Sequence, residues 1–347
     1  MLHLNPMDKH IELMANAPYR MSYRPGMDVS KWQEEAREKL KELLGLPLET
    51  APSDDFTIIS DTEDGPENGD LRYHDIYFTF SSEPTVTVAC HLLLPLQYEG
   101  RIPLMICLQG HTKGMHISLG KTRYPGEEPL ILNGDRDFGP QIVRKGFAAL
   151  VMEQRGFGDR GGSADGPGCY QIALSAMLIG RTLIGERCWD VSRGIDCVLA
   201  HFDMIDSERI GLMGQSGGGT VTCYETAIEP RIKAAIPSCA FCGYMDSIGV
   251  QRHCTCNYVP GIMKYFDMSD LAGMAAPRPL IIVNGAQDTS FPLASNSFEF
   301  EKAQKIYEAA GAADNIYHVV GPEGHRYYAA LAWPEFDKRT GWDKTES

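Results

Sequence analysis

A serine among glycines, an aspartate and a histidine each follow an apolar run in the second half of the chain. Ser216 stands in GQSGG, directly after the run RIGLMG and before a stretch of helical periodicity. Asp288 follows LIIVNG, and His325 follows HVVG in a loop that contains glycine and proline. A serine hydroxyl becomes a nucleophile when a histidine accepts its proton and an acid orients that histidine. The order serine, acid, histidine therefore predicts Ser216 as nucleophile, Asp288 as orienting acid and His325 as base.

Each of these assignments has a competing interpretation. The glycine-rich segment could form a simple turn or a phosphate-binding loop, and Asp288 could only cap a turn. Asp246 is a competing acid, and His111 and His253 are competing bases. We favour Asp288 and His325 because both follow predicted strands in the required order.

Two backbone N–H groups are predicted to stabilise the oxyanion that forms when a serine attacks a carbonyl carbon. The first belongs to Gly217, the residue after the nucleophile. The second belongs to His111 in CLQGH, which follows the apolar run IPLMICL. This polar segment could instead serve only as a turn. Gln109, Gly110 and Gln215 flank the two donors and are candidate substrate contacts.

Arg155, in MEQRGFG, is a further candidate substrate contact at the same predicted sheet edge. Its five donors also suit hydrogen bonds to the carbonyl groups of neighbouring loops. This bracing role is the alternative that we favour for Arg155.

Five potential metal ligands lie close together in CAFCGYMDSIGVQRHCTC: Cys239, Cys242, His253, Cys254 and Cys256. Their spacing leaves a structural zinc site or a redox pair open, but zinc ribbons usually pair two C-x-x-C segments. Buried cysteines often pack as small apolar side chains, and we expect packing or pocket lining here. The sequence contains no nucleotide, dinucleotide or zinc-protease motif, so we expect neither a cofactor nor a metal.

Short apolar runs alternate with helical patterns from Ile102 onward. The runs are apolar on both faces, as in strands buried between two helix layers: IPLMICL, FAALVME, RIGLMG, RIKAAIP, RPLIIVNG and NIYHVVG. Helical periodicity is present in CWDVSRGIDCVLAHF and SFEFEKAQKIYEAAG. The alternation predicts an α/β fold with a doubly wound, mostly parallel sheet and helices on both faces.

The residues before this core predict a helix and a hairpin. DVSKWQEEAREKLKELLGLP has the pattern of an amphipathic helix, with a capping box formed by Ser30 and Gln33 and a stop at Gly45. Two alternating blocks in residues 69–95, separated by SSEP, predict an antiparallel hairpin.

We therefore divide the chain into an N-terminal extension, residues 1–75, and a catalytic domain, residues 76–347. Two connections in the catalytic domain are long, residues 110–140 and 238–277. Both leave the carboxyl ends of predicted parallel strands, where open α/β sheets bind ligands. We expect both connections to form pocket walls.

Composition argues against several classes of partner. The net charge is −14 and basic residues form no cluster, which disfavours nucleic-acid binding. No apolar run has the length of a membrane span, and the N-terminus lacks the apolar core of an export signal. Ten cysteines in 347 residues are too few for a disulfide scaffold, so we expect a cytoplasmic protein. The expected partner is a small-molecule ester, and a homo-oligomer is left open.

Several segments between Trp32 and His325 together resemble the α/β-hydrolase superfamily, and within it the acetyl xylan esterases and dienelactone-hydrolase-like esterases. They are WQEEAREKLKELLG, CLQGH, EQRGFG, CWDVSRGID, IGLMGQSGGG, APRPLIIVNGAQD and GPEGH. The resemblance implies a serine carboxylesterase that acts on small acyl esters, acetyl esters foremost, and plausibly on carbohydrates.

The chain departs from these families at three points. Dienelactone hydrolases proper have a cysteine nucleophile where this chain has Ser216, which favours simple ester hydrolysis. Glucuronoyl esterases have an arginine shortly after the serine, whereas Gly217 and Gly218 stand here. Many oxyanion loops of the superfamily contain His-Gly where this one contains Gln109 and Gly110. A peptidase of the prolyl-oligopeptidase type and a non-catalytic binding module are the alternative functions.

Overall fold

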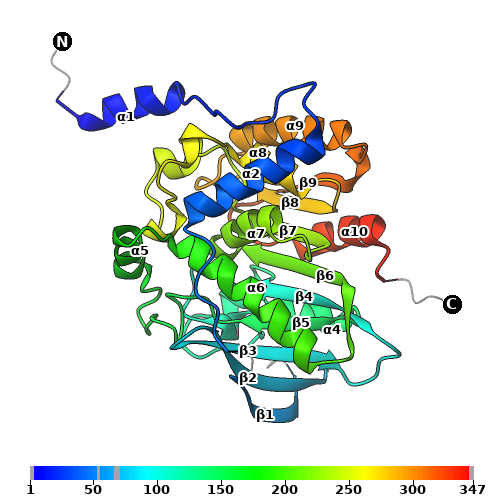
Figure 1. Cartoon of the computed structure of the whole chain (residues 1–347). Helices are drawn as coiled ribbons and strands as arrows, with labels where there is room; N and C mark the ends of the chain where they lie inside the picture. The colour runs from blue at the N-terminus through cyan, green and yellow to red at the C-terminus, as the bar shows by residue number, and fades with distance from the viewer. Residues whose placement is uncertain (1–3, 53–54, 66–70, 344–347) are drawn as a thin grey trace.

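The computed structural model describes residues 4–52, 55–65 and 71–343, and one mixed sheet runs through them (Figure 1). Its strands follow the order β1-β2-β3-β5-β4-β6-β7-β8-β9. The pairs β1–β2, β2–β3 and β3–β5 are antiparallel, and all pairs from β5 to β9 are parallel. The predicted doubly wound, mostly parallel sheet is confirmed. The strand bounds are β1 Phe56–Asp64, β2 Tyr73–Glu83, β3 Val86–Pro95, β4 Ile102–Leu108, β5 Ala148–Met152, β6 Ile205–Gln215, β7 Ala234–Ser238, β8 Leu280–Gly285 and β9 Ile316–Gly321.

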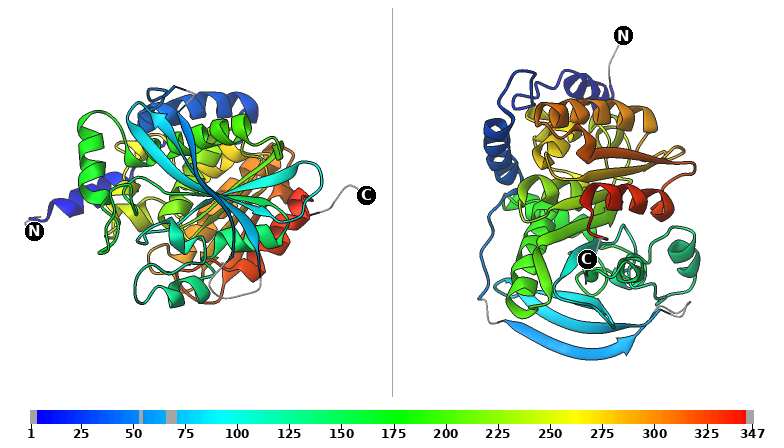
Figure 2. Two further views of the ribbon diagram at one scale, coloured as in Figure 1. Left: turned by 90° about the horizontal axis from the view of Figure 1, so that it is seen from below. Right: turned by 90° about the vertical axis from the view of Figure 1, so that its right-hand side faces the viewer.

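Helices cover both faces of the strongly twisted sheet, as Figure 2 shows. Side chains of α2, α6, α7 and α8 share one core with the sheet, and those of α4 and α10 share the other. The α-helix bounds are α1 Pro6–Ala15, α2 Val29–Leu44, α3 Glu128–Leu132, α4 Phe138–Arg144, α5 Cys169–Leu178, α6 Leu183–His201, α7 Gly217–Ile228, α8 Met268–Ala275, α9 Leu293–Ala309 and α10 Ala329–Thr340. The short turns are η1 Met115–Ile117, η2 Met245–Gly249, η3 Thr255–Asn257, η4 Ile262–Lys264 and η5 Ala313–Asn315.

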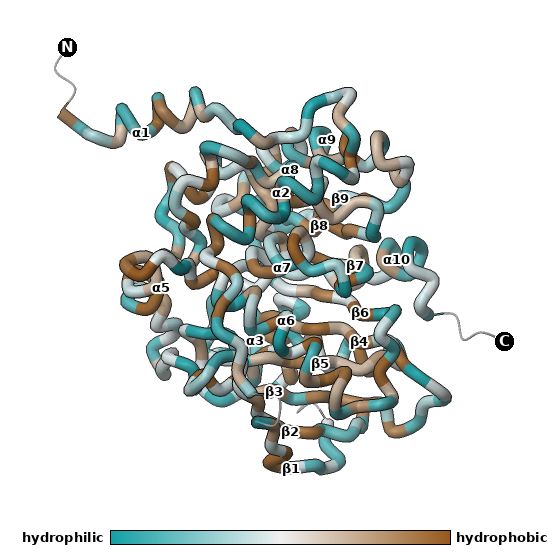
Figure 3. Tube along the Cα trace, viewed as in Figure 1, coloured by the Kyte–Doolittle hydropathy of each residue, from teal (hydrophilic) through white to brown (hydrophobic). Residues whose placement is uncertain are grey.

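Strand β4 shows why the central apolar runs are continuous. Leu104 and Ile106 belong to the core beneath α6 and α7, whereas Met105 and Cys107 belong to the core beneath α4 and α10. Successive side chains of a strand point to opposite faces, so a strand covered on both sides is apolar at every position. Figure 3 shows the apolar colour along the middle strands.

Helix α2 packs on the main body through the predicted face. Its buried apolar side chains are Trp32, Ala36, Leu40 and Leu44. Gly45 ends the helix in the left-handed conformation at φ 80°, which confirms the predicted stop.

The predicted capping box of α2 is wrong. Asp28 is the N-cap residue, and its carboxylate accepts a hydrogen bond of 3.0 Å from the Lys31 N–H. Gln33 is buried and donates to the carbonyl oxygens of Gly273 and Ala276 instead. Aspartate and serine are about equally good N-cap residues, so Asp28 was as suitable a helix start as Ser30.

The hairpin predicted in residues 69–95 is confirmed as β2 and β3, although Gly69 and Asp70 lie outside the described residues. Strand β1 was not predicted. It lies at the sheet edge and exposes most of its side chains, so its sequence carries little periodic signal. The division proposed at residue 75 falls inside β2, which pairs with both neighbouring strands.

The two long connections contain short helical elements. Residues 110–140 contain η1, α3 and the start of α4, and residues 238–277 contain η2, η3, η4 and α8. Helix α1, at the upper left of Figure 1, buries none of its residues and contacts the main body at η2. Among the described residues, no helix combines the length and apolar character that crossing a membrane requires.

Candidate active site

Ser216 lies at the sharp turn between β6 and α7. Its backbone has φ 56° and ψ −117°, a conformation that a non-glycine residue rarely adopts. The Ser216 N–H donates to the Ser238 carbonyl at 2.8 Å, which ties the turn to β7. Gly218 packs directly against the carbonyl oxygens of Leu108 and Gln109, so a Cβ atom there would clash with backbone. A strained residue between a strand and a helix, with glycine packed against backbone, is the geometry in which a side chain is exposed above a sheet.

His325 and Asp288 form a hydrogen-bonded pair beside this turn. His325 Nδ1 lies 2.7 Å from Asp288 Oδ2, and His325 follows β9 while Asp288 follows β8. Asp288 Oδ1 accepts from the N–H groups of Ser290 at 2.9 Å and Phe291 at 3.3 Å. The Asp288 side chain is 1% exposed and that of His325 is 31% exposed, so the base reaches solvent while the acid does not.

Burial alone would raise the pKa of Asp288. The hydrogen bond and charge of His325, together with the N–H groups of Ser290 and Phe291, outweigh burial and lower that pKa below its ordinary value. Asp288 is therefore an ionised carboxylate, so the proton in its hydrogen bond with His325 is carried by Nδ1. This leaves Nε2 of the imidazole free for a second partner.

A cavity of about 370 Å³ contains both Ser216 and His325 in its walls. The other lining residues, mostly from the 238–277 connection and the loop after β8, are His111, Pro167, Arg252, His253, Cys254, Asn257, Ser290 and Phe291. The phenyl ring of Phe291 stacks on the His325 imidazole, with a centroid distance of 5.9 Å. Sequence analysis did not identify Phe291, because its ring approaches the imidazole only through the fold of the loop after β8.

The competing bases His111 and His253 also line this cavity, but their hydrogen-bond partners are not carboxylates. His253 Nε2 lies 3.0 Å from the Ser247 hydroxyl, and burial lowers the pKa of His253. Asp246 stands in η2, and its backbone carbonyl accepts a hydrogen bond from Gln251. Of the three candidate bases, His325 is the one whose imidazole pairs with a carboxylate.

Gly217 and His111 lie side by side next to the nucleophile. A Cβ atom on Gly217 would stand 2.7 Å from Cε1 of His111. Gly110 is equally close to the turn, because its Cβ atom would stand 3.1 Å from that of Ser216. The backbone around residues 110 and 111 thus approaches the N-terminus of α7, where N–H groups favour negative charge.

Gln109 and Gln215 point into the protein and do not line the cavity. Both are 1% exposed. Gln109 donates to Glu153 at 2.6 Å, and its backbone carbonyl accepts from Gln154 at 2.7 Å. The side-chain amide nitrogen and oxygen of Gln215 have no hydrogen-bond partner among the described residues. Gln215 packs against Gly110 in residues 109–111, which carry the proposed oxyanion donor and are called the oxyanion segment below.

Glu153 is a buried acid that sequence analysis did not single out. Its carboxylate accepts from Gln109 and from the Met115 N–H, so it connects the end of β5 to the segment after β4. Burial raises the pKa of Glu153 to about 7. Its place directly after the all-apolar strand β5 was the sequence feature that could have identified Glu153.

Arg155 is buried and does not line the cavity. Its guanidinium contacts Asp190 at 2.8 Å and Glu83 at 2.8 Å, and it lies 3.4 Å from Glu186. Although burial alone would raise the pKa of Asp190, Arg160 and Arg155 lower it to about 2. Arg155 thus braces α6 against the end of β2.

The cysteines singled out in the sequence divide into separate places. Cys239 follows β7, has φ 48°, and offers a sulfur close to the paired atoms of Asp288 and His325. Cys254 and Cys256 instead lie with His111 and Cys169. All ten cysteines of the chain are free thiols.

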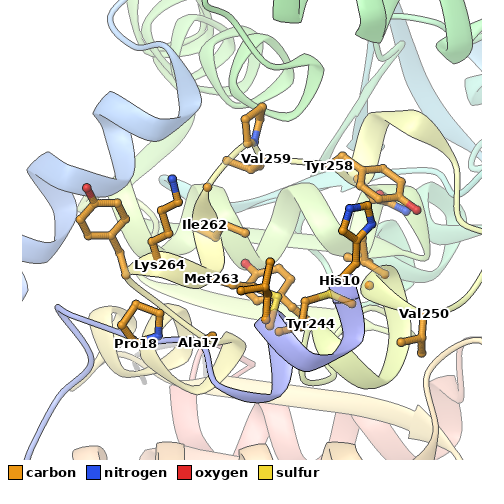
Figure 4. Close-up of a pocket in the computed structure, with 18 of the residues that line it drawn as sticks. His10, Ala17, Pro18, Tyr244, Val250, Tyr258, Val259, Ile262, Met263 and Lys264 are labelled. Carbon is orange, nitrogen blue, oxygen red and sulfur yellow. The ribbon is translucent and has the colours of Figure 1, made fainter. Parts of the chain in front are cut away.

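A larger cavity of about 1220 Å³ lies beside the first, between α1 and residues 244–265 (Figure 4). Its walls include Tyr244, Ile262 and Met263, and it shares Arg252 and Asn257 with the cavity that contains Ser216. The two cavities therefore adjoin at Arg252 and Asn257.

Comparison with known proteins gives a family and a set of similar folds. The model of the Abhydrolase family matches residues 11–315, which is most of the chain. The Bacillus subtilis (strain 168) protein named "Putative hydrolase YtaP" is 27% identical over 242 residues, covering 68% of this chain and 77% of that protein.

Two solved structures show the same fold at low sequence identity. The "putative acetyl xylan esterase (BF1801)" of Bacteroides fragilis has a TM-score of 0.74 and 16% identity, covering 97% of this chain and 90% of that one. A glucuronoyl esterase from Solibacter usitatus has a TM-score of 0.71 and 14% identity, covering 94% and 97%. Such likeness establishes the α/β-hydrolase fold.

Proposed function

Because this chain belongs to the Abhydrolase family, we propose that it is a serine carboxylesterase that hydrolyses small acyl esters. The observation that most supports the proposal is the 2.7 Å pair of His325 and Asp288 beside a cavity that Ser216 also lines. The strained backbone of Ser216 supports it further, because such strain is retained where it exposes a reactive group.

In the proposed reaction, His325 Nε2 takes the proton of the Ser216 hydroxyl as Oγ attacks the carbonyl carbon of the ester. Asp288 holds Nδ1–H and stabilises the imidazolium that forms. The N–H groups of Gly217 and His111 donate to the oxyanion. The imidazolium then gives its proton to the departing alcohol, which leaves an acyl-Ser216 ester. Water, deprotonated by His325, attacks this ester and releases the acid and free Ser216.

The proposed acyl group is small, with acetyl foremost, because the cavity that contains Ser216 holds only about 370 Å³. The adjoining cavity of about 1220 Å³ offers room for the alcohol part of the substrate. Acylated oligosaccharides are plausible alcohols, since two similar folds carry the names acetyl xylan esterase and glucuronoyl esterase.

Labelling with a fluorophosphonate, located by mass spectrometry, tests the proposal. We expect wild type and Ser290→Ala to be labelled and Ser216→Ala to remain unlabelled. Ser290 is the control because it lines the same cavity but lies in the loop after β8, not in the turn between β6 and α7. Turnover of p-nitrophenyl acetate by Ser216→Ala should fall by about 10⁴ to 10⁶. Labelling elsewhere, or unchanged turnover, would refute the nucleophile.

The two alternative functions give different results in the same assays. A peptidase of the prolyl-oligopeptidase type would cleave an aminoacyl anilide faster than p-nitrophenyl acetate. A binding module that only retains the fold would turn over neither substrate and would not react with the fluorophosphonate.

A further inference from the structure

Three sulfur atoms and one imidazole nitrogen converge beside the candidate active site. They belong to His111, Cys169, Cys254 and Cys256, and one ligand atom from each lies within 4.8 Å of all the others. His111 Nε2 is 3.1 Å from Sγ of Cys256. His111 comes from the segment after β4, Cys169 begins α5, and the other two cysteines flank Thr255 in η3.

Apolar packing does not explain this cluster. Phe157, Ala173 and Leu183 do pack around Cys169 and Cys256. Packing gives no reason, however, for a histidine nitrogen to approach a sulfur at hydrogen-bond distance in the same place. A disulfide would use only two of the sulfurs, and all of them are free thiols.

A buried arginine lies against this cluster. Arg187 is 1% exposed, and its Nη2 donates to Sγ of Cys169 at 3.2 Å. In the part of the chain that the structure describes, Arg187 forms no ion pair with a carboxylate, and its Nη1 has no hydrogen-bond partner. Its Nε and Nη2 donate to the Arg155 carbonyl and its guanidinium lies over the Phe157 ring, so an anionic group bound at the cluster would balance its charge.

We propose that His111, Cys169, Cys254 and Cys256 bind one Zn²⁺ ion in a closed tetrahedral site. Zinc is bound by thiolates and imidazole at about 2.3 and 2.0 Å, which fits four ligand atoms within a few ångströms of one another. Three thiolates and a neutral imidazole around Zn²⁺ carry a net charge of −1, which the guanidinium of Arg187 balances. Four protein ligands leave no open position, so the ion is structural.

The zinc would fix the oxyanion segment. It would join the segment after β4 to α5 and to η3, three parts of the chain that lie far apart in sequence. His111 is also the residue whose ring contacts Gly217, and His111 and Cys254 line the cavity with Ser216. This effect on catalysis rests on the proposed esterase function, whereas metal binding does not.

Metal content of the purified full-length chain tests the proposal. We expect about one zinc per chain by inductively coupled plasma mass spectrometry. Replacement of the zinc by cobalt should give thiolate-to-metal charge-transfer absorption. X-ray absorption should find about three sulfur neighbours and one nitrogen neighbour. Zinc content below about a tenth per chain after incubation with Zn²⁺ and dialysis, or an iron–sulfur cluster or a disulfide among these cysteines, would overturn it.

Variants localise the ion. Cys169→Ser and Cys256→Ser should lose most of the bound zinc, and Cys242→Ser should retain it. Cys242 is the matched control because it is equally buried in the 238–277 connection but lies outside the cluster. Where a ligand variant does not fold, the wild-type protein can be treated with a thiol-modifying reagent while zinc release is followed. Bound zinc should protect three thiols from the reagent, and one ion should be released when those three thiols react. Zinc release without protection of these thiols would refute the site.

Fluorophosphonate labelling of the same samples separates the two proposals. Labelled Ser216 in a protein that binds no zinc would overturn the metal site alone. One zinc per chain without labelling would leave the metal site standing and overturn the esterase.

Discussion

Replacing Asp288 by asparagine removes the charge of the candidate acid while keeping its shape. Asp288 Oδ1 accepts from two backbone N–H groups, and Oδ2 faces His325 Nδ1. The amide oxygen of asparagine will take the place of Oδ1, because the reverse orientation loses two hydrogen bonds of about 1 kcal/mol each. The amide NH₂ then donates to His325 Nδ1, which moves the imidazole proton to Nε2.

This tautomer cannot accept the proton of Ser216. A preference of about 2 kcal/mol leaves roughly one molecule in 30 with the productive tautomer, which sets a lower limit of about 30-fold on the loss of kcat. Loss of the carboxylate that stabilises the imidazolium adds to this loss. We therefore expect kcat to fall by about 10⁴, equivalent to about 5.5 kcal/mol.

The assay is hydrolysis of p-nitrophenyl acetate by Asp288→Asn and by Asp246→Asn. Asp246, the competing acid after β7, should tolerate the change within about twofold, because it makes no contact with His325 among the described residues. A loss of kcat below 30-fold in Asp288→Asn would refute the reasoning. A large loss confined to Asp246→Asn would transfer the role to that residue.

Three further predictions concern the surroundings of the site. In Gly217→Ala the new Cβ atom would stand 2.7 Å from Cε1 of His111, so both oxyanion donors must shift and kcat should fall about 100- to 1000-fold. Burial raises the pKa of Glu153 from 4.5 to about 7, so the folded protein retains a proton that the unfolded chain releases. The free energy of unfolding of wild type should therefore fall by about 3 kcal/mol between pH 4.5 and 7 relative to Glu153→Gln, as measured by urea denaturation. Arg155→Met removes one of the two arginine partners of the buried Asp190 and should lower the free energy of unfolding by about 1 to 3 kcal/mol, because Arg160 still pairs with Asp190, with KM unchanged in the folded fraction.

Each of these three has a result that contradicts it. Gly324→Ala is the matched control for Gly217→Ala, since its Cβ atom would have its nearest neighbour at 3.7 Å, and equal losses in both would dismiss the His111 contact. Parallel pH profiles for wild type and Glu153→Gln would show that Glu153 ionises at its ordinary pKa. A raised KM with unchanged stability in Arg155→Met would return Arg155 to substrate binding.

Local sequence was sufficient where one element fixed the outcome. The apolar runs predicted β4 through β8 because a strand covered on both faces must be apolar throughout. The run NIYHVVG also predicted β9, although this edge strand exposes Tyr317 and Val320. The glycines around Ser216 predicted the turn because only glycine admits such close backbone approach. Strand β1 escaped prediction because an exposed edge strand has no such constraint.

The part of the candidate site that depends on the order of residues along the chain was predictable. Sequence order placed Asp288 and His325 after neighbouring strands, and the structure joins them at 2.7 Å. It could not show that Gln109 and Arg155 point inward, because that depends on the buried carboxylates of Glu153 and Asp190.

The sequence by itself therefore determined the order of the strands along the chain, the glycine-rich turn and the chemical types available after each strand. Only the tertiary structure decided which of those side chains meet. Cys254 and Cys256 are close to Cys242 in sequence, yet they gather with His111 and Cys169 from two distant segments. The physical reason is that periodicity specifies which face of an element is buried, whereas contacts between loops depend on how the elements pack.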